Sequence, residues 1–243
     1  MPPADRAEQA PGLGALARRG GAWVLLGRMA GEALRFGTNL VLTRLLFPEA
    51  FGLMLLVNSI LQGLALFSDV GINASVIQHA RGEEPGFLRT AWTLQALRGL
   101  LLWLVCLAAA GPLAAFYGAP ELRLLVPVAG LGALFSGFNS MSLGLLARRL
   151  ELRRLVLLEL CVQAAAAATM IGWAILHPSV WALAAGGVAG SVLRMAASHC
   201  LPGAGRPRPG WDRPALAAIL GFGAWVFFNS ILGFLADQVD RLA

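Results

Sequence analysis

Residues 91–110 read AWTLQALRGLLLWLVCLAAA, a run of twenty residues in which Arg98 is the single charged side chain. The hydrocarbon core of a bilayer is about 30 Å thick, and roughly 20 mostly apolar helical residues are needed to cross it. Backbone N–H and C=O groups inside lipid must also find partners within the chain, which an α-helix provides. This stretch therefore predicts a membrane-spanning helix.

Runs of the same kind recur along the chain. The predicted spans are Gly21–Leu42, Ala50–Phe67, Ala91–Ala110, Leu122–Leu146, Leu155–Leu176 and Val180–Leu201, and a seventh begins near Ala215. The composition agrees, because 58% of the 243 residues are hydrophobic and only 13% are charged, which excludes an ordinary water-soluble domain. The expected fold class is all-α, a polytopic membrane helix bundle.

The basic residues indicate an orientation in the membrane. All 19 are arginine, and they are concentrated in alternate loops. One side of the predicted bundle has only Arg44 and Arg123. The twelve on the other side are Arg6, Arg18, Arg19, Arg81, Arg89, Arg148, Arg149, Arg153, Arg154, Arg206, Arg208 and Arg213. Short cytoplasmic loops retain arginine, so the N-terminus is expected in the cytoplasm. The alternation also argues against a nucleic-acid partner, which needs one basic patch.

Four segments are expected along the chain. Residues 1–20 form a cytoplasmic disordered tail, and residues 21–201 form a six-helix transmembrane lobe. Residues 202–214, rich in proline, glycine and arginine, form a cytoplasmic linker that cannot be helical. Gly21-Ala-Trp-Val24 recurs as Gly223-Ala-Trp-Val226. This repeat predicts that residues 215–243 are the first helix of a second, truncated lobe with the same orientation as the first.

Polar side chains inside the spans are the predicted binding residues, because such groups are costly in lipid and mark transport pathways. Spacings of three and four residues place them on single helix faces. The candidates are Arg28, Glu32, Arg35 and Asn39 in the first span, Asn58 and Gln62 in the second, and Gln95 and Arg98 in the third.

The arginines among these candidates predict a shared cavity. An arginine near the bilayer centre costs about 2.5–3.5 kcal/mol when it faces lipid, so Arg28, Arg35 and Arg98 should face one another or water. Arg28 and Arg98 lie about seven residues into their spans, or roughly 10 Å deep, at one level of the membrane. We expect a hydrated cavity, open to the cytoplasm in at least one state, that favours an anion and has Glu32 as its one deep acid.

An alternative explanation needs no ligand. Glu32 would neutralise its helical neighbours, and Arg98 would extend its side chain to the cytoplasmic edge of the membrane. Arg194 and Glu159 lie nearer the cytoplasmic ends of their spans, and the same extension toward water is expected of both.

No catalytic site, metal or cofactor is predicted. His79, His177 and His199 have no carboxylate or cysteine at ligand spacing. The pattern GxxxxGK[ST] does not occur, so the chain has no P-loop for ATP hydrolysis. Glu83 and Glu84 are the only adjacent pair of acids, and we expect them in a solvated loop rather than in an active site. A membrane enzyme is therefore disfavoured.

Several separated loop motifs resemble those of a known family. In chain order they are Leu40-Val-Leu-Thr-Arg44-Leu-Leu-Phe-Pro48-Glu-Ala-Phe51-Gly52-Leu, Leu66-Phe-Ser-Asp69-Val-Gly71-Ile-Asn-Ala-Ser-Val-Ile-Gln78, Phe116-Tyr117-x-x-Pro120-x-Leu122, Leu145-Leu-Ala-Arg148-Arg149-Leu and Val180-Trp181-Ala182-Leu183. They are similar to the first hairpin, the second-span exit, an outer loop, the fourth-span exit and the sixth-span entry of bacterial polysaccharide flippases. These flippases are the Wzx-like branch of the MATE-related exporter superfamily.

The resemblance runs from about Phe36 to the end of the chain and implies a function. It implies one lobe and the first helix of the next in a two-lobed transporter of the bacterial inner membrane. Such a transporter flips undecaprenyl-pyrophosphate-linked oligosaccharide repeats for O-antigen, capsule or exopolysaccharide synthesis. The implied partners are this anionic lipid-linked sugar, membrane lipids, and the polymerase and glycosyltransferases of the pathway. The alternative is a cation-coupled multidrug exporter of the same superfamily, which three deep arginines against one glutamate disfavour.

Overall fold

The computed structural model describes residues 13–68, 71–201, 203 and 208–223. All regular secondary structure in these ranges is helical, so the all-α prediction is confirmed. The helices are α1 (Leu13–Leu45), α2 (Pro48–Phe67), α3 (Ile72–Gln78), α4 (Pro85–Tyr117), α5 (Leu122–Gly137), α6 (Ser142–Arg148), α7 (Leu152–Leu176) and α8 (Val180–Cys200), followed by a helix over Arg213–Gly223.

Four of the described helices, α2, α4, α7 and α8, are long and apolar enough to cross a bilayer. The pair α5 and α6 would make a fifth span if the two helices cross together, with a bend of 60° at their break. Helix α1 is long enough, but Arg28, Glu32 and Arg35 make it more charged than the others. The chain is therefore a multi-pass helical membrane protein, and α1 is the most charged of its long described helices.

Three features of the described part differ from the prediction. Helix α1 begins at Leu13, so residues 13–20 are helical although a disordered tail was expected there. The predicted fourth span, Leu122–Leu146, is two helices separated by residues 138–141. The short helix α3 follows α2 where a loop was expected. Residues 1–12 and 224–243, which include most of the expected second-lobe helix, lie outside the described residues.

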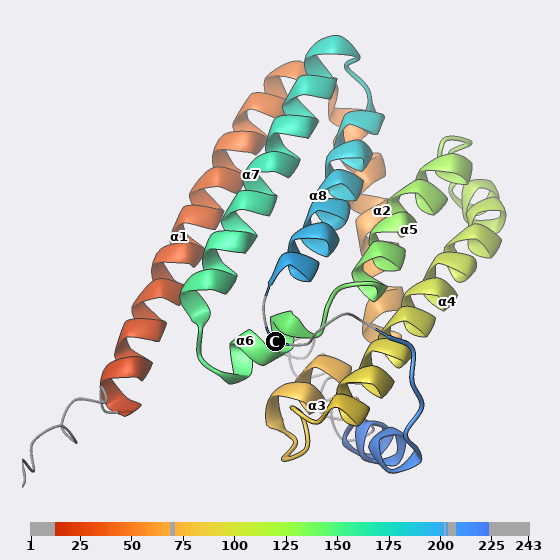
Figure 1. Ribbon diagram of the computed structural model, residues 1–243. Coiled ribbons are helices and arrows are strands. Elements are labelled where there is room, and N and C mark those ends of the chain that lie inside the picture. The colour runs from red at the N-terminus through yellow and green to blue at the C-terminus, as the bar shows by residue number, and fades with distance from the viewer. Residues whose placement is uncertain (1–12, 69–70, 202, 204–207, 224–243) are drawn as a thin grey trace, which may run out of the picture.

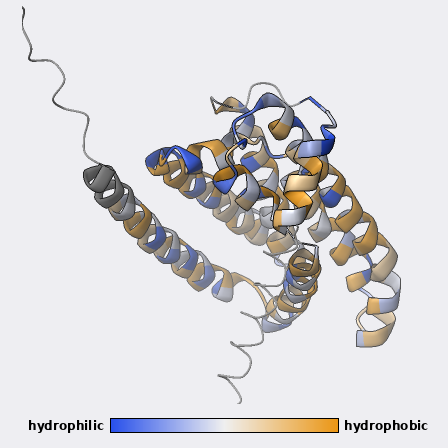
Figure 2. Cartoon of the chain, turned by 90° about the horizontal axis from the view of Figure 1, so that it is seen from below, coloured by the Kyte–Doolittle hydropathy of each residue, from blue (hydrophilic) through white to orange (hydrophobic). Residues whose placement is uncertain are grey.

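The long helices lie side by side in the order α1, α7, α8, α5 and α4, each packing against the next (Figure 1). Helix α2 packs against both α5 and α8. Apolar residues dominate the long helices (Figure 2). Helices α3 and α6 and the helix over Arg213–Gly223 gather at one end of the bundle, which we call the α3–α6 end (Figure 1).

Two clusters of buried side chains hold this arrangement. One cluster joins α1, α2 and α5 and includes Leu42, Val57 and Leu122, which have no exposed surface. The other lies at the α3–α6 end and includes Phe87 and Ile219, also without exposed surface. Inside lipid, close packing of this kind stabilises the association of helices. Burial of apolar side chains alone brings little gain there, because lipid tails are as apolar as leucine.

Glycines allow two helices to come close. A Cβ atom at Gly99 of α4 would lie 2.8 Å from the Cα of Gly137 in α5 and 2.8 Å from the carbonyl oxygen of Ala133. Backbone atoms cannot give way as a flexible side chain can, so only glycine fits at this crossing. The contact brings the last turn of α5 against the middle of α4, where Gln95 and Arg98 lie.

Candidate functional site

A cavity of about 590 Å³ lies among α4, α5, α6, α7 and α8, and we call it the central cavity. In the described part of the chain, three charged side chains line it: Arg98 from α4, Glu159 from α7 and Arg194 from α8. Gln95 and Asn139 are among its polar lining residues. The cavity is therefore bordered by two cations, one anion and several amides inside a predominantly apolar bundle.

Glu159 and Arg194 form an ion pair across two helices. Nη1 of Arg194 donates to Oε1 of Glu159 at 3.1 Å, and the two side chains are 44% and 52% exposed. The sequence predicted that both would extend separately toward the cytoplasmic edge. The structure instead pairs them in the cavity wall, because α7 and α8 pack together and bring the two positions opposite each other.

Arg98 binds the end of a neighbouring helix. Its Nη2 donates to the carbonyl oxygen of Ala65 at 2.9 Å, and its Nε donates to Oγ of Ser68 at 3.1 Å. The last carbonyls of a helix have no partner within the helix, and a cation there also interacts favourably with the helix dipole. The half-buried Arg98 side chain therefore caps the C-terminus of α2 while lining the central cavity.

Gln95 holds the break between α5 and α6. Its Nε2 lies 3.0, 3.3 and 3.4 Å from the carbonyl oxygens of Ser136, Gly137 and Asn139, and the side chain is buried. Irregular backbone at membrane depth is tolerated where it is buried in protein or lines a cavity, and this break meets both conditions. Gln95 was predicted as a binding residue, and the hydrogen bonds that the structure shows for it are to the backbone.

One buried acceptor at the break has no hydrogen-bond partner among the described residues. Oδ1 of Asn139 is buried and accepts no hydrogen bond from any described residue, although Asn139 lines the central cavity. The next residue is held firmly, since the N–H of Ser140 donates to Oγ of Ser198 at 2.9 Å. A buried polar atom without a partner usually binds water or a ligand group, so the floor of the cavity has unused hydrogen-bonding capacity.

A second cavity of about 410 Å³ lies between α1 and α7, and we call it the α1–α7 cavity. Arg28, Glu32 and Arg35 line it from α1. Nη1 of Arg35 lies 3.7 Å from Oε1 of Glu32, and both side chains are more than half exposed. Glu159 lines this cavity as well as the central one, so the two adjoin at this carboxylate.

Two glycines of α1 make the contact with α7. A Cβ atom at Gly27 would collide with the side chain of Val156, and one at Gly31 would lie 3.1 Å from Oε1 of Gln163. Nε2 of Gln163 donates to the carbonyl oxygen of Gly31 at 3.0 Å. Gly27-x-x-x-Gly31 is the small-residue spacing typical of close membrane helix pairs. This spacing is visible in the sequence and could have predicted the α1–α7 contact, which was not foreseen.

The predicted site residues are thus divided in space. Arg28, Glu32 and Arg35 line the α1–α7 cavity, and Gln95 and Arg98 line the central cavity. Arg28 and Arg98, expected in one shared wall, line adjoining cavities instead.

The other three predicted residues lie elsewhere. Asn39, Asn58 and Gln62 are exposed and line neither of these cavities.

Comparison with known proteins supplies the family. A family model described as polysaccharide biosynthesis protein matches residues 41–243. The chain belongs to this family. The matched region contains the whole central cavity, whereas Arg28, Glu32 and Arg35 precede it. The loop resemblance found in the sequence is therefore confirmed.

A curated relative of this chain is the succinoglycan biosynthesis transport protein ExoT of Rhizobium meliloti (strain 1021). The two are 26% identical over 163 residues, which cover 67% of this chain and 33% of the relative. The chain thus spans about a third of the length of the relative that it matches. No solved structure gives a significant match.

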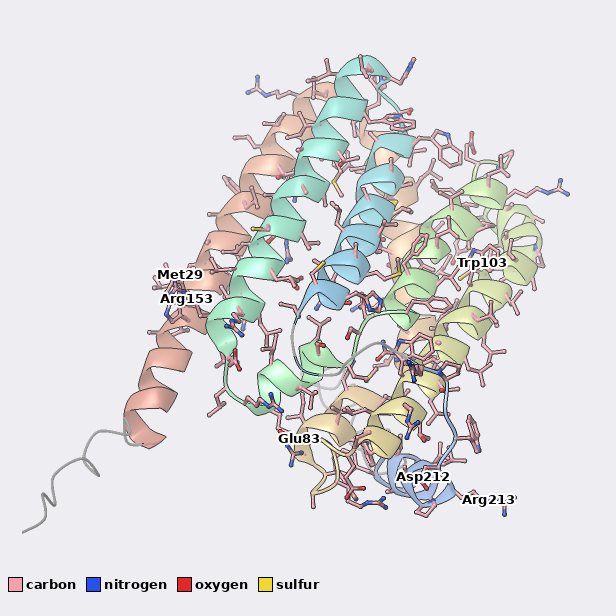
Figure 3. The ribbon with its side chains drawn as sticks, in the orientation of Figure 1. Met29, Glu83, Trp103, Arg153, Asp212 and Arg213 are labelled. Atoms are coloured by element: carbon pink, nitrogen blue, oxygen red, sulfur yellow. The ribbon has the colours of Figure 1, made fainter. Side chains whose placement is uncertain are left out.

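The α3–α6 end of this family member carries a network of charged groups. Nη1 of Arg148 donates to the carbonyl oxygens of Val76, Ile77 and His79 at 3.2, 3.0 and 2.6 Å, which ties α6 to the end of α3. Nη2 of Arg149 lies 3.2 Å from Oε2 of Glu83, a residue labelled in Figure 3. The hydrogen bond and charge of Arg149 lower the pKa of Glu83. Glu83 and Glu84 are exposed, as expected of a solvated loop, and Arg149 anchors this loop through Glu83.

Proposed function

We propose that this chain is the part of a polysaccharide exporter that binds undecaprenyl-pyrophosphate-linked oligosaccharide and moves it from the cytoplasmic to the periplasmic face of the bacterial inner membrane. The observation that carries the proposal is the charge of the two adjoining cavities. Among the described residues, four arginines and two glutamates line them: Arg28, Arg35, Arg98, Arg194, Glu32 and Glu159. The excess of positive charge favours an anionic ligand.

Arg194 is the arginine best suited to take the pyrophosphate. Its partner in the cavity is one carboxylate oxygen at 3.1 Å, and the pair is about half exposed, so an incoming phosphate oxygen can replace Glu159 at little cost. The planar guanidinium can then donate two parallel hydrogen bonds to phosphate, a geometry that lysine cannot offer. Arg98 adds positive charge to the same wall while it caps α2.

The break between α5 and α6 suits the sugar part of the ligand. Sugars present hydroxyl groups that both donate and accept hydrogen bonds, and the amide side chains of Gln95 and Asn139 are among the polar residues that line the cavity. Transport would follow from rocking of this helix lobe against a second lobe around the shared site. In this proposal the arginine-rich α3–α6 end, with Arg81, Arg148 and Arg149, faces the cytoplasm, as the positive-inside rule favours.

The cavity assignment can be tested by ligand binding to the full chain in lipid nanodiscs. Undecaprenyl pyrophosphate is titrated against wild type, Arg194→Ala, Arg194→Lys and Arg123→Ala. A lost charge-assisted hydrogen bond is worth about 1.5–3 kcal/mol, so Arg194→Ala should weaken binding by about tenfold or more. Arg194→Lys should recover part of the affinity, and the control Arg123→Ala, in the first turn of α5 and lining neither cavity, should match wild type.

Two results would contradict this function. If Arg194→Ala binds undecaprenyl pyrophosphate as wild type does, the central cavity is not the anion site. If wild type binds a quaternary ammonium dye and not the pyrophosphate, the cation-coupled multidrug exporter becomes the better assignment. A complementary test measures the polysaccharide on the cell surface of a producing host. The Arg194→Ala variant should lose this polysaccharide although the variant protein is present at the wild-type level.

A further inference from the structure

An apolar groove of about 420 Å³ lies between α2 and α4, and we call it the α2–α4 groove. Among the described residues, eleven line it, of which nine are apolar and the two others are Ser68 and Arg98. Phe67 from α2 and Leu220 from the helix over Arg213–Gly223 form parts of its wall. The groove is therefore built from three segments that are distant in sequence.

One face of α4 supplies the floor of the groove. Leu94, Leu97, Leu101 and Val105 recur at the three- and four-residue spacing of a single helix face. Leu97 and Leu101 are 46% and 53% exposed, so the floor is open to a ligand.

The groove and the central cavity meet at Arg98 and Leu102, which line both. On one side of this boundary the lining includes amides and the Glu159–Arg194 pair, and on the other side it is almost wholly hydrocarbon. A molecule that occupies both spaces must therefore join a polar, anionic head to a long apolar chain. A free sugar phosphate would leave the groove empty, and an ordinary apolar solute would not enter the cavity.

We propose that the α2–α4 groove holds the first isoprene units of the polyprenyl chain of the lipid-linked substrate, while its pyrophosphate lies in the central cavity, beyond the boundary marked by Arg98 and Leu102. This inference rests on the proposed function and adds to it the place where the lipid tail binds. The tail lies within a single lobe, against α2 and α4, so it stays in contact with protein while the head occupies the central cavity.

Helix α4 provides a matched control. Leu101 and Leu104 are 53% and 46% exposed, but only Leu101 lines the groove. Bulk lipid would contact both leucines alike, whereas a bound polyprenyl chain would contact Leu101.

Photo-cross-linking can distinguish these two cases. The full chain is made in two versions, with the photoreactive amino acid p-benzoylphenylalanine replacing either Leu101 or Leu104. Each version is irradiated in nanodiscs that contain undecaprenyl pyrophosphate. Labelling by this lipid should be at least fivefold stronger at position 101 and should fall when unlabelled undecaprenyl pyrophosphate competes. Equal labelling at both positions would overturn the proposal.

Filling the groove tests it without a cross-linker. Leu101→Trp should weaken the binding of undecaprenyl pyrophosphate by about tenfold and leave the binding of inorganic pyrophosphate, which has the same phosphate groups and no isoprene unit, unchanged. Leu104→Trp should alter neither. If Leu101→Trp binds the long lipid as wild type does while Arg194→Ala does not, the groove assignment fails and the head-binding function stands. If wild type binds neither pyrophosphate, both proposals fail.

Discussion

Glu159 of α7 accepts a hydrogen bond from Arg194 of α8 at 3.1 Å and at the same time lines the cavity that contains Arg28 and Arg35 of α1. One carboxylate is thus shared by two arginine-lined spaces. Any anion that enters the central cavity competes with Glu159 for Arg194, and a released Glu159 lies beside further cations. An anionic ligand can therefore separate this half-exposed ion pair, whereas a fully buried structural pair would be out of its reach.

The first prediction concerns this competition. Glu159→Gln removes the carboxylate that opposes an anionic ligand, and half-exposed ion pairs are worth about 0.2–1 kcal/mol. Affinity for undecaprenyl pyrophosphate should therefore rise by up to about fivefold, as measured by titration in nanodiscs. Glu121→Gln, an exposed change at the start of α5, should leave affinity unchanged. Weaker binding by Glu159→Gln would mean that the carboxylate positions Arg194 rather than competing for it.

The second prediction separates Arg98 from Arg28. Arg98→Ala leaves the carbonyl of Ala65 and the hydroxyl of Ser68 without this partner, at a cost of about 1.5–3 kcal/mol. The melting temperature of the purified chain should fall by roughly 3–10 °C. Arg28→Ala, at an exposed position, should melt as wild type does. If the two variants melt alike, the capping of α2 by Arg98 contributes nothing to stability.

The third prediction tests the crossing of α4 and α5. Gly99→Ala places a methyl group 2.8 Å from backbone atoms of α5, and such overpacking costs about 1–3 kcal/mol. Gly111→Ala, on the same helix with no atom within 4 Å, should change stability by less than about 1 kcal/mol. Thermal unfolding measures both. A Gly99→Ala protein as stable as the Gly111→Ala protein would show that the helices can separate at no cost.

The fourth prediction concerns pH. Arg149 lowers the pKa of Glu83 below its ordinary value of 4.5, so folding favours the ionised carboxylate. The stabilisation is fully present above pH 4.5 and is lost as the pH falls through the lowered pKa. Hydrogen exchange of the loop over residues 79–84 should speed up in acid relative to its intrinsic rate. Glu83→Gln should remove this pH dependence. A wild-type loop whose protection is constant from about pH 3 to pH 7 would contradict it.

The spans were predictable because hydropathy is a local property. The predicted fifth span ends at Leu176, as α7 does, and the predicted sixth begins at Val180, as α8 does. The break over residues 138–141 was missed because hydropathy was averaged over a whole span, although Ser136, Gly137, Asn139, Ser140 and Ser142 form a local cluster of polar and small residues there. It is held by Gln95, forty or more residues earlier in the chain, and by the hydroxyl of Ser198.

The candidate site was predicted in part for a similar reason. Helical spacing correctly placed Arg28, Glu32 and Arg35 on one face, and that face lines a cavity. Helical spacing gives no information on partners from other helices. Asn39 and Gln62 were therefore grouped with the site, although they line neither cavity. Glu159 and Arg194 were set aside because each was considered on its own helix.

The sequence by itself determined that the chain is an all-helical membrane bundle, because twenty-residue apolar runs have few other stable states, and that its buried-span arginines need partners or water. The tertiary structure alone decided what each arginine does: Arg98 caps α2, whereas Arg194 pairs with Glu159 in the wall of the central cavity. The physical reason is that burial in lipid depends on the composition of one segment, whereas pairing depends on where two helices cross. Those crossings are set by close contacts such as Gly99 with Gly137, which join residues far apart in the chain.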